Sequence, residues 1–261
     1  MSFAMYIKKY DLSGQTAFIT GGGRGIGLAA GEALLEVGAK VIISDLDPAV
    51  LQSGRAQLAD KGWQVEAVQL DVTDADAVGR VASDMNERYG AIDILIANAG
   101  IAWPDTPGEA MADEVWRKVV DVDLNGVYWS CREFGRPMLV RGRGSIVTIG
   151  SMSGLISNKP QRQAHYNAAK AGVHHLTRSL AGEWAERGVR VNTVAPTYVD
   201  TVMSRGGFTD PNLFPIWMEN TPMKRVARAD EIASAILFLA SEASSAMTGS
   251  LLVVDCGYTI W

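Results

Sequence analysis

The stretch TGGGRGIG, residues 20–27, decides the fold. It follows a short apolar run, Thr16–Thr20, and opens a pattern typical of a helix, Ile26–Val37. Glycines in such a turn let the backbone bend sharply and let a phosphate group come close to it. The free N–H groups and the positive end of the following helix attract the pyrophosphate of a dinucleotide. Strand, turn and helix together therefore predict a dinucleotide-binding site.

An acidic residue follows the next apolar run: Asp45 lies close to the expected spacing beyond Gly27. A carboxylate at this position accepts hydrogen bonds from the ribose 2′-hydroxyl of NAD and repels the 2′-phosphate of NADP. Arg24 argues for NADP, because a cation in the glycine turn can approach that phosphate. Asp45 is expected to face the 2′-position directly, whereas Arg24 can turn to solvent, so we expect NAD as the cofactor.

Short apolar runs alternate with helical patterns along the chain. The runs are nearly continuous in apolar residues, as in strands covered on both faces, and lie at Thr16–Thr20, Lys40–Ser44, Val65–Leu70, Ile92–Ala97, Ser145–Ile149, Arg190–Val194 and Leu251–Val254. The helical patterns include Ile26–Val37, Asp74–Tyr89, Val115–Phe134, Tyr166–Arg187 and Asp230–Leu239. This alternation predicts an α/β protein of the Rossmann type, with a doubly wound sheet of seven parallel strands and helices on both faces.

No linker or internal repeat divides the 261 residues. We therefore expect a single domain, 1–261, with a cofactor half at about 14–150 and a catalytic half at about 151–261. The segment 197–225 interrupts the alternation with three prolines and a glycine pair. Such a segment is typical of a lid over a site; the alternative is a surface excursion with two short helices. Thr73 and Asp76 have the spacing of a helix capping box.

Composition excludes several classes of protein. The net charge of −5 argues against nucleic acid or an anionic membrane as a partner. The longest apolar runs are far shorter than a membrane span, and residues 1–10 lack the ordered regions of a signal peptide. Two cysteines predict neither a disulfide framework nor a thiolate metal site. His165, His174 and His175 do not have the arrangement of metal ligands, so we expect no bound metal. Without a signal peptide, a membrane span or a disulfide framework, we expect a cytoplasmic protein.

Motifs further along the chain resemble those of the short-chain dehydrogenase/reductase family. They are Asn98-Ala99-Gly100, Ser151, Tyr166-x-x-x-Lys170 and Asn192 before Pro196, and with the glycine turn they cover essentially the whole chain. The resemblance implies a homotetramer, in which the helical patterns at 115–134 and 166–180 would pair. It also implies a nicotinamide cofactor bound by Gly21, Arg24, Gly25, Ile26, Gly27, Asp45, Asp71, Val72, Asn98, Ala99, Gly100, Tyr166, Lys170, Pro196, Val199 and Thr201.

Tyr166 and Lys170 suggest a chemistry by their own properties. Residues four apart share one helix face, so the ammonium can lie near the phenol. A free phenol has a pKa near 10. A fixed cation, together with the positive charge of an oxidised nicotinamide, favours the phenolate and lowers that pKa. We expect Tyr166 to take the proton of an alcohol as hydride leaves its carbon, while Ser151 orients the substrate oxygen.

Two serines compete for the last role. The family commonly has its serine thirteen residues before the tyrosine, a count that selects Ser153. Aligning on the serine three residues before a glycine selects Ser151 and leaves two extra residues in the following loop. Loops absorb insertions more readily than strand ends, so we assign Ser151. Ser153 then becomes a substrate contact or a turn residue.

Two positions depart from the family pattern. Asp123 stands where the family usually has an asparagine, which holds a helix kink and a water that links the lysine to solvent. A carboxylate can accept from that water, and its charge tends to keep Lys170 protonated, so we include Asp123 as a relay residue. Thr197 replaces the glycine that is common after Pro196. Neither departure removes the serine, tyrosine and lysine.

The substrate is the least determined feature. The resemblance is closest to NAD-dependent sugar-alcohol dehydrogenases of the galactitol type, through Gly150–Gly154 and the ending Gly257–Trp261. A hydroxylated substrate needs paired polar groups, and candidates are Ser153, Asn158, Gln161 and Gln163. A bulkier ketone would instead suit the apolar side chains of Trp103, Met152, Tyr198, Phe214 and Trp217.

We therefore expect an NAD-dependent polyol dehydrogenase. Its substrate contacts are expected to be Ser151, Ser153, Asn158 and Tyr166. One alternative is a reductase of 3-oxoacyl groups or hydrophobic ketones. The other is a nucleotide-sensing protein that keeps the fold but has lost turnover.

Overall fold

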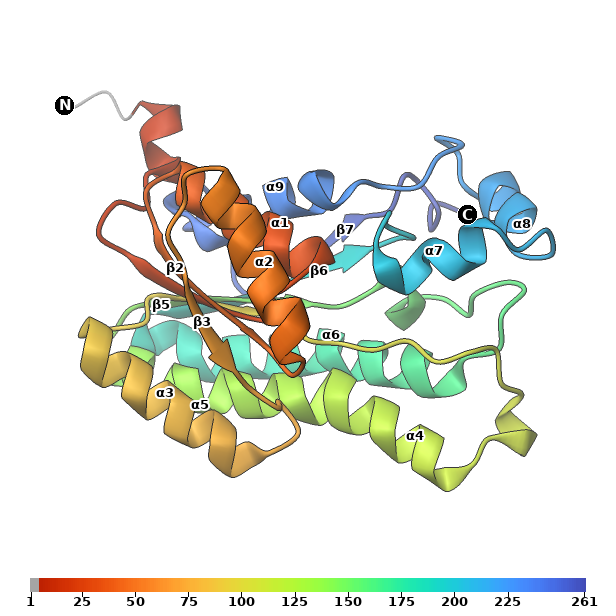
Figure 1. Cartoon of the computed structure of the whole chain (residues 1–261), viewed down its shortest axis with the longest axis horizontal. Helices are drawn as coiled ribbons and strands as arrows, with labels where there is room; N and C mark the ends of the chain where they lie inside the picture. Colours follow the sequence, from red (N-terminus) through yellow and green to blue (C-terminus); the bar gives the residue numbers. More distant parts are fainter. Residues whose placement is uncertain (1–4) are drawn as a thin grey trace.

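The computed structural model describes residues 5–261 and contains one parallel sheet of seven strands (Figure 1). The strands are β1 Thr16–Thr20, β2 Lys40–Asp45, β3 Glu66–Gln69, β4 Ile94–Ala97, β5 Gly144–Ile149, β6 Val189–Pro196 and β7 Leu251–Val254. Their order in the sheet is β3-β2-β1-β4-β5-β6-β7, and every neighbouring pair is parallel. The predicted sheet is confirmed: β1 and β7 have the predicted bounds, and each other strand differs by one or two residues at one or both ends.

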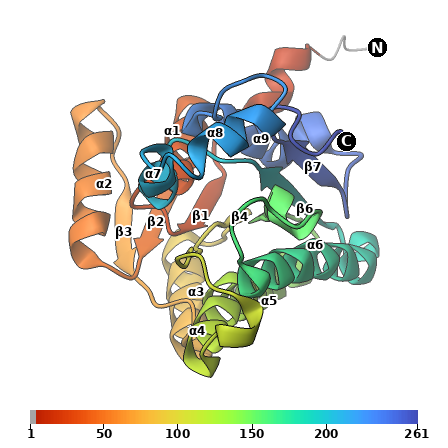
Figure 2. The same ribbon diagram turned by 90° about the vertical axis from the view of Figure 1, so that its right-hand side faces the viewer.

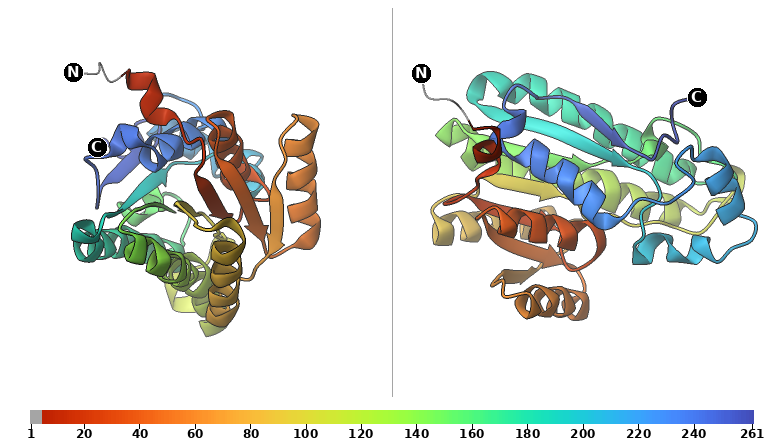
Figure 3. Two further views of the ribbon diagram at one scale, coloured as in Figure 1. Left: turned by 90° about the vertical axis from the view of Figure 1, so that its left-hand side faces the viewer. Right: turned by 90° about the horizontal axis from the view of Figure 1, so that it is seen from above.

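Helices cover both faces of the sheet, as predicted. One face carries α1 Gly25–Glu36, α2 Pro48–Asp60 and α9 Ala229–Ala240. The other carries α3 Ala75–Tyr89, α4 Asp113–Val120, α5 Gly126–Arg141 and α6 Ala164–Trp184. Figure 3 shows α2 beside the β3 edge of the sheet, at the opposite edge from β7.

Alternate residues of the central strands enter two separate apolar layers, because successive side chains of a strand point to opposite faces. Ile19 and Ile43 lie in the layer under α1 and α9. Phe18 and Ile42 lie in the layer under α3 and α5, where the Phe18 ring stacks on that of Phe134 with centroids 4.4 Å apart. Both layers are fully buried, which explains the nearly continuous apolar sequence of the strands.

Two helix predictions need correction. The helix α2 was not expected, although Asp47 caps it by accepting from the Ala49 N–H and Pro48 occupies its first position. The single helix expected at Val115–Phe134 consists of α4, a π-helical turn at Asp121–Asn125 and α5. The π turn does not interrupt the apolar periodicity, so periodicity alone could not reveal it.

The predicted capping box at Thr73 is wrong. Asp74 is the N-cap of α3, and its carboxylate accepts from the Ala77 N–H at 2.9 Å. Thr73 is occupied elsewhere, because its N–H and its hydroxyl both donate to Oδ1 of Asp71, at 2.8 and 2.7 Å. The competing turn at Asp71 therefore moves the start of the helix by one residue.

The segment 197–225 forms two short helices, α7 Val202–Phe208 and α8 Phe214–Asn220, at the carboxyl end of the sheet (Figure 2). The Trp217 ring stacks on Tyr198 with centroids 3.8 Å apart. At Gly207 a Cβ atom would lie 2.1 Å from the Trp217 ring, so only glycine lets α7 pack this closely on α8. The two short helices are those of the alternative interpretation, a surface excursion, and that the segment is a lid stays a prediction.

The start of the chain forms a 3-10 turn, Tyr6–Tyr10. The interpretation that residues 1–10 form no signal peptide concerns in part residues 1–4, which lie outside the described residues. Within residues 5–261 no helix has both the length and the apolar character needed to cross a membrane.

Candidate active site

A cavity of about 520 Å³ lies at the carboxyl ends of the strands, where the strand order reverses between β1 and β4. We call it the carboxyl-end cavity. Nearly all residues predicted to hold a cofactor line it; the exception, Gly27, is buried behind the glycine turn. The predicted residues that line it are Gly21, Arg24, Gly25, Ile26, Asp45, Asp71, Val72, Asn98, Ala99, Gly100, Tyr166, Lys170, Pro196, Val199 and Thr201.

The glycine turn is held in shape by the end of β4. Gly21 and Gly25 have φ angles of +62° and +56°, which favour glycine. A Cβ on Gly27 would lie 2.3 Å from the Gly21 carbonyl oxygen, so the helix can begin this close to the strand only with glycine there. The Asn98 amide donates to the carbonyls of Thr20 and Gly21 at 3.0 and 2.9 Å. The turn is therefore rigid where a pyrophosphate would approach.

Asp45 and Arg24 differ in how they meet this turn. Asp45 ends β2, and its Oδ2 lies 3.1 Å from the position that a Cβ on Gly23 would occupy. Arg24 is exposed to solvent. Both residues line the carboxyl-end cavity, but the Asp45 carboxylate lies against the turn, whereas Arg24 is exposed.

Tyr166 and Lys170 project from α6, and Ser151 follows β5. The Lys170 ammonium donates to the Ile149 carbonyl at 3.0 Å and lies 5.6 Å from the centroid of the Tyr166 ring. All three polar side chains line the carboxyl-end cavity. The structure therefore brings together a phenol, a buried ammonium and a hydroxyl around one space, which is the set needed for proton transfer to or from a bound alcohol or ketone.

The pKa of Tyr166 is raised above its ordinary value near 10. Burial is the main cause and the charge of Asp123 adds to it, while the interaction with the Ser151 hydroxyl opposes the rise. We expected Lys170 to lower this pKa, and in the protein alone it does not bring it down. The positive charge of an oxidised nicotinamide, if one were bound in this cavity, would favour the phenolate.

Asp123 lies on the π-helical turn and is fully buried. Its Oδ1 accepts from the Ile101 N–H at 2.7 Å, and its Oδ2 is buried with no hydrogen-bond partner. Burial raises the pKa of this carboxyl to about 6, although Lys170 and the Ile101 hydrogen bond act in the opposite direction. A Cβ on Gly100 would lie 2.9 Å from Asp123 Oδ1 and 3.4 Å from Lys170 Nζ. Asp123 therefore lies behind the cavity wall.

The predicted substrate contacts separate into two groups. Ser151, Ser153 and Tyr166 line the carboxyl-end cavity, whereas Asn158 does not. Asn158 is buried, and its amide donates to the Tyr198 hydroxyl at 3.3 Å. Its Oδ1 accepts from Gln163 at 3.1 Å. The polarity of Asn158 is thus used inside the protein, so the prediction that it contacts substrate is not supported by its position.

Two cavity residues have properties that sequence reasoning did not anticipate. Gln161 bridges the loop and the segment 197–225, because its amide donates to the Tyr198 hydroxyl at 2.9 Å and accepts from the Trp217 indole at 2.9 Å. Thr197, noted only as a departure, has a buried hydroxyl with no partner at the cavity wall. Of the predicted apolar wall residues, Phe214 does not line the cavity.

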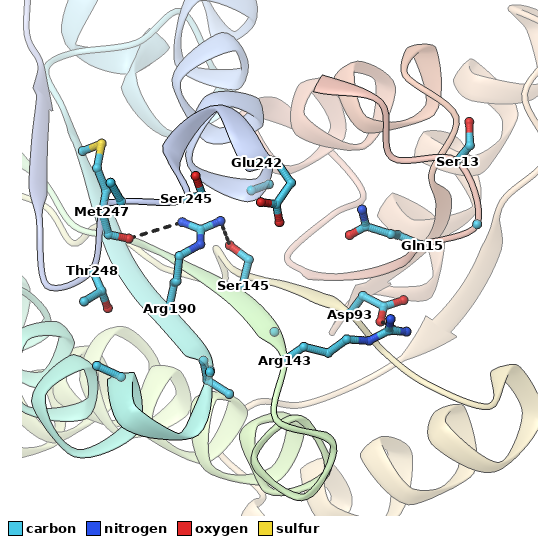
Figure 4. A pocket seen from close by; sticks show the side chains of 17 residues that line it. Ser13, Gln15, Asp93, Arg143, Ser145, Arg190, Glu242, Ser245, Met247 and Thr248 are labelled. Carbon is cyan, nitrogen blue, oxygen red and sulfur yellow. Dashed lines mark hydrogen bonds and ion pairs between the residues drawn. The ribbon is translucent and has the colours of Figure 1, made fainter. Parts of the chain in front are cut away.

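A second cavity, of about 700 Å³, lies at the amino ends of β1, β4, β5 and β6, and we call it the amino-end cavity (Figure 4). Figure 4 shows the Arg190 guanidinium bonded to Ser145 and to Met247, and Asp93 beside Arg143. None of the residues predicted to act in catalysis or cofactor binding lines it. Among residues 5–261 no group of three or more histidine, cysteine or acidic residues is placed to hold a metal ion.

Comparison with known proteins agrees with this geometry. A family model described as Enoyl-(Acyl carrier protein) reductase matches residues 21–259. The galactitol 2-dehydrogenase of Rhizobium johnstonii is 46% identical over 98% of this chain and 99% of its own. The crystal structure of gox2181 is 49% identical, with a TM-score of 0.96 over 98% of this chain and 100% of that one. A Burkholderia cenocepacia gluconate 5-dehydrogenase, solved with NADP and tartrate, is 33% identical with a TM-score of 0.92, over 98% of this chain and 100% of that one.

Proposed function

Because the chain belongs to the short-chain dehydrogenase/reductase family, whose members use a nicotinamide cofactor, we propose that it is an NAD-dependent dehydrogenase. Its substrate is the secondary alcohol of a polyol or sugar alcohol. The observation that carries this proposal is the meeting of Ser151, Tyr166 and Lys170 at one cavity that also contains the glycine turn. A site that merely senses a nucleotide has no need of a phenol, an ammonium and a hydroxyl around the same space.

The protein's own residues supply the acid–base chemistry. The Ser151 hydroxyl would orient the substrate oxygen, and the Tyr166 phenolate would accept its proton during oxidation and return it during reduction. Lys170 uses one of its three N–H donors on Ile149, so two remain for the hydroxyls of a ribose. When bound, the nicotinamide supplies the hydride acceptor. Asp123 would act through Lys170 as a relay residue.

The preference for NAD rests on Asp45. Its carboxylate lies against the glycine turn, where it would accept hydrogen bonds from a ribose 2′-hydroxyl and repel a 2′-phosphate. Arg24 is exposed and so gains less from binding a phosphate at the same place. The NADP bound by the Burkholderia cenocepacia enzyme makes this preference the part of the proposal that most needs a direct measurement.

The preference for a polyol rests on similarity to galactitol 2-dehydrogenase and on the polar wall of the cavity. Ser153, Gln161 and Gln163 line the substrate side; because Tyr198 and Trp217 engage the Gln161 amide, Ser153 and Gln163 are the groups proposed to pair with hydroxyl groups of the substrate. Trp103 and Trp217 line the same cavity and would cover the carbon chain. As part of this proposal the protein is a cytoplasmic homotetramer, an assembly that light scattering can measure.

The test is absorbance at 340 nm with NAD or NADP and a panel of hexitols and pentitols. We expect reduced cofactor to form with NAD and at least one polyol, and Tyr166→Phe to lower kcat by about 10³-fold while leaving cofactor binding intact. The reverse assay uses ketoses, a 3-oxoacyl thioester and an apolar cyclic ketone. Faster reduction of the thioester or apolar ketone than of any ketose would overturn the polyol proposal. Cofactor binding without turnover in either direction would favour a nucleotide sensor.

A further inference from the structure

Tyr166, Lys170 and His174 are spaced by four residues along α6 and therefore share one face of the helix. The proposed chemistry uses the first two and leaves His174 without a role. His174 is buried, yet it lies on the face that meets the end of β5, where Ser151 begins the next turn. Its contacts there are polar as well as apolar.

The backbone N–H of Ser151 donates to Nε2 of His174 at 3.3 Å. This bond requires a neutral ring with its proton on Nδ1, because a protonated Nε2 could not accept. Burial, with Lys170 and Arg178 as the nearby cations, lowers the pKa of His174 to about 4. The ring therefore stays an acceptor throughout the range in which a dehydrogenase would be assayed.

Two glycines make room for this ring. A Cβ on Gly150 would lie 2.3 Å from His174 Nε2, and a Cβ on Gly154 would lie 2.6 Å from the ring carbon Cε1. Neither glycine has a positive φ, so their lack of a side chain serves the close approach of the ring rather than an unusual backbone conformation. The imidazole is thus enclosed by the loop that carries Ser151.

The position of the Ser151 backbone determines the position of its hydroxyl. The Ser153 N–H donates to Ser151 Oγ at 3.1 Å, and the Gly154 N–H donates to the Ser151 carbonyl at 3.0 Å. These bonds close a short turn, and the Ser151 N–H at its start is bound by His174. One residue earlier, the Gly150 N–H donates to Val194 of β6 at 2.8 Å.

We propose that His174 is a positioning residue, which holds Ser151 at a fixed place relative to Tyr166 by accepting the Ser151 N–H from the same helix face. The motif on α6 is then Tyr-x-x-x-Lys-x-x-x-His, in which the lysine binds the carbonyl of Ile149 and the histidine binds the N–H of Ser151. This inference rests on the proposed proton transfer at Tyr166, and it does not depend on which alcohol is the substrate.

The test compares His174→Leu, which fills the site without an acceptor, with His174→Gln, whose side-chain oxygen can reach the place of Nε2. His175→Leu is the matched control, because His175 is the neighbouring residue and is exposed. We expect His174→Leu to lower kcat about tenfold with little change in the KM for the cofactor, since a misplaced hydroxyl affects the reaction more than binding. His174→Gln should recover most of the loss, and His175→Leu should match the wild type.

A purely structural role would change stability but not the pH profile. Because the Ser151 hydroxyl lowers the pKa of Tyr166, loosening it in His174→Leu should move the rise of the oxidation rate to higher pH. His174→Gln should move it back. A profile identical to that of His175→Leu would overturn the proposal. If the leucine variant fails to fold, His174→Met serves the same purpose with a more adaptable side chain.

Hydrogen exchange provides a readout that needs no substrate. The Ser151 amide should exchange about tenfold faster in His174→Leu than in the wild type, and should be protected again in His174→Gln. Unchanged exchange in His174→Leu would overturn the proposal even if activity fell. If the wild type oxidises no polyol, the proposed function fails, whereas the exchange comparison still decides whether His174 holds Ser151.

Discussion

The two cavities at opposite ends of the sheet use their polar groups differently. At the amino-end cavity the Arg190 guanidinium donates to six oxygen atoms, contributed by Ser145, Leu239, Ser241, Ser244 and Met247. At the carboxyl-end cavity the Thr197 hydroxyl has no partner, and behind the wall Asp123 Oδ2 has none either. In the larger, amino-end cavity the Arg190 guanidinium is therefore already hydrogen-bonded within the protein. The smaller, carboxyl-end cavity has polar atoms without a partner.

This difference shows why volume is a poor guide to function. Polar groups that satisfy one another hold the protein together, whereas buried groups without partners cost stability and are retained where a ligand uses them. Substitutions at the amino-end cavity should therefore reduce stability and spare catalysis. Substitutions at the carboxyl-end cavity should change catalysis or cofactor choice, and some should increase stability.

The largest effect on stability is expected at Arg190. Arg190→Leu removes the donor for several partly buried carbonyls, so the free energy of unfolding should fall by about 3–4 kcal/mol. Urea unfolding measures the loss, and kcat per folded molecule should stay within about twofold of the wild type. Arg143→Leu is the control from the same cavity, because that side chain is 73% exposed and should matter by less than about 1 kcal/mol. A large fall in kcat for Arg190→Leu would remove the distinction between the two ends.

The second-largest effect on stability is expected for Asp123→Asn, and its size depends on pH. The folded-state pKa of Asp123 is about 6, above its ordinary value of 3.8. A raised pKa gives stability that is fully present below the ordinary value and is lost as the pH rises through the folded value. Relative to Asp123→Asn, the wild type should therefore lose about 2–3 kcal/mol between pH 4 and pH 7. Urea unfolding of both proteins at several pH values measures this difference.

The kinetics of the same variant give a second result. Because the Asp123 charge raises the pKa of Tyr166, its removal should move the rise of the oxidation rate to lower pH. A stability difference that does not vary between pH 4 and pH 7 would mean that the pKa of Asp123 is the same in the folded and the unfolded chain, so that burial does not raise it.

The smallest effect is a change of cofactor preference at Asp45. Asp45→Asn removes the charge that repels a 2′-phosphate, so the KM for NADP should fall and that for NAD should rise about tenfold. Steady-state kinetics with both cofactors measure the ratio, and thermal stability should not change, because the carboxylate is only partly buried. An unchanged ratio would assign the preference to Arg24 or to another residue of the turn.

Much of the fold could be predicted because the central strands are apolar on both faces and the glycine turn stands between a strand and a helix. The helix α2 was missed although Asp47 and Pro48 were readable start signals. The capping error at Thr73 arose because spacing does not show which of two neighbouring carboxylates, Asp71 or Asp74, binds which N–H.

The candidate site could likewise be predicted only in part. That Tyr166 and Lys170 meet at one cavity could be predicted, because their spacing follows the helix. Asn158 was assigned to the substrate on polarity alone, and polarity does not show whether a side chain turns inward to Tyr198 or outward to a ligand. The role inferred for His174 depends on two glycines that are distant from it in sequence, and their contact with its ring exists only in the folded chain.

The lining of the carboxyl-end cavity extends from Gly21 to Trp217 along the chain. During biosynthesis, the residues proposed to bind the cofactor are therefore not all present until the chain has been made as far as Thr201, and the whole lining not until Trp217. A ligand stabilises only molecules that bind it, so the cellular cofactor pool would stabilise finished chains and give no advantage to truncated ones. Products of interrupted translation would stay exposed to proteolysis. Because the residues of the site come from most of the chain, cofactor binding would favour the survival of full-length molecules.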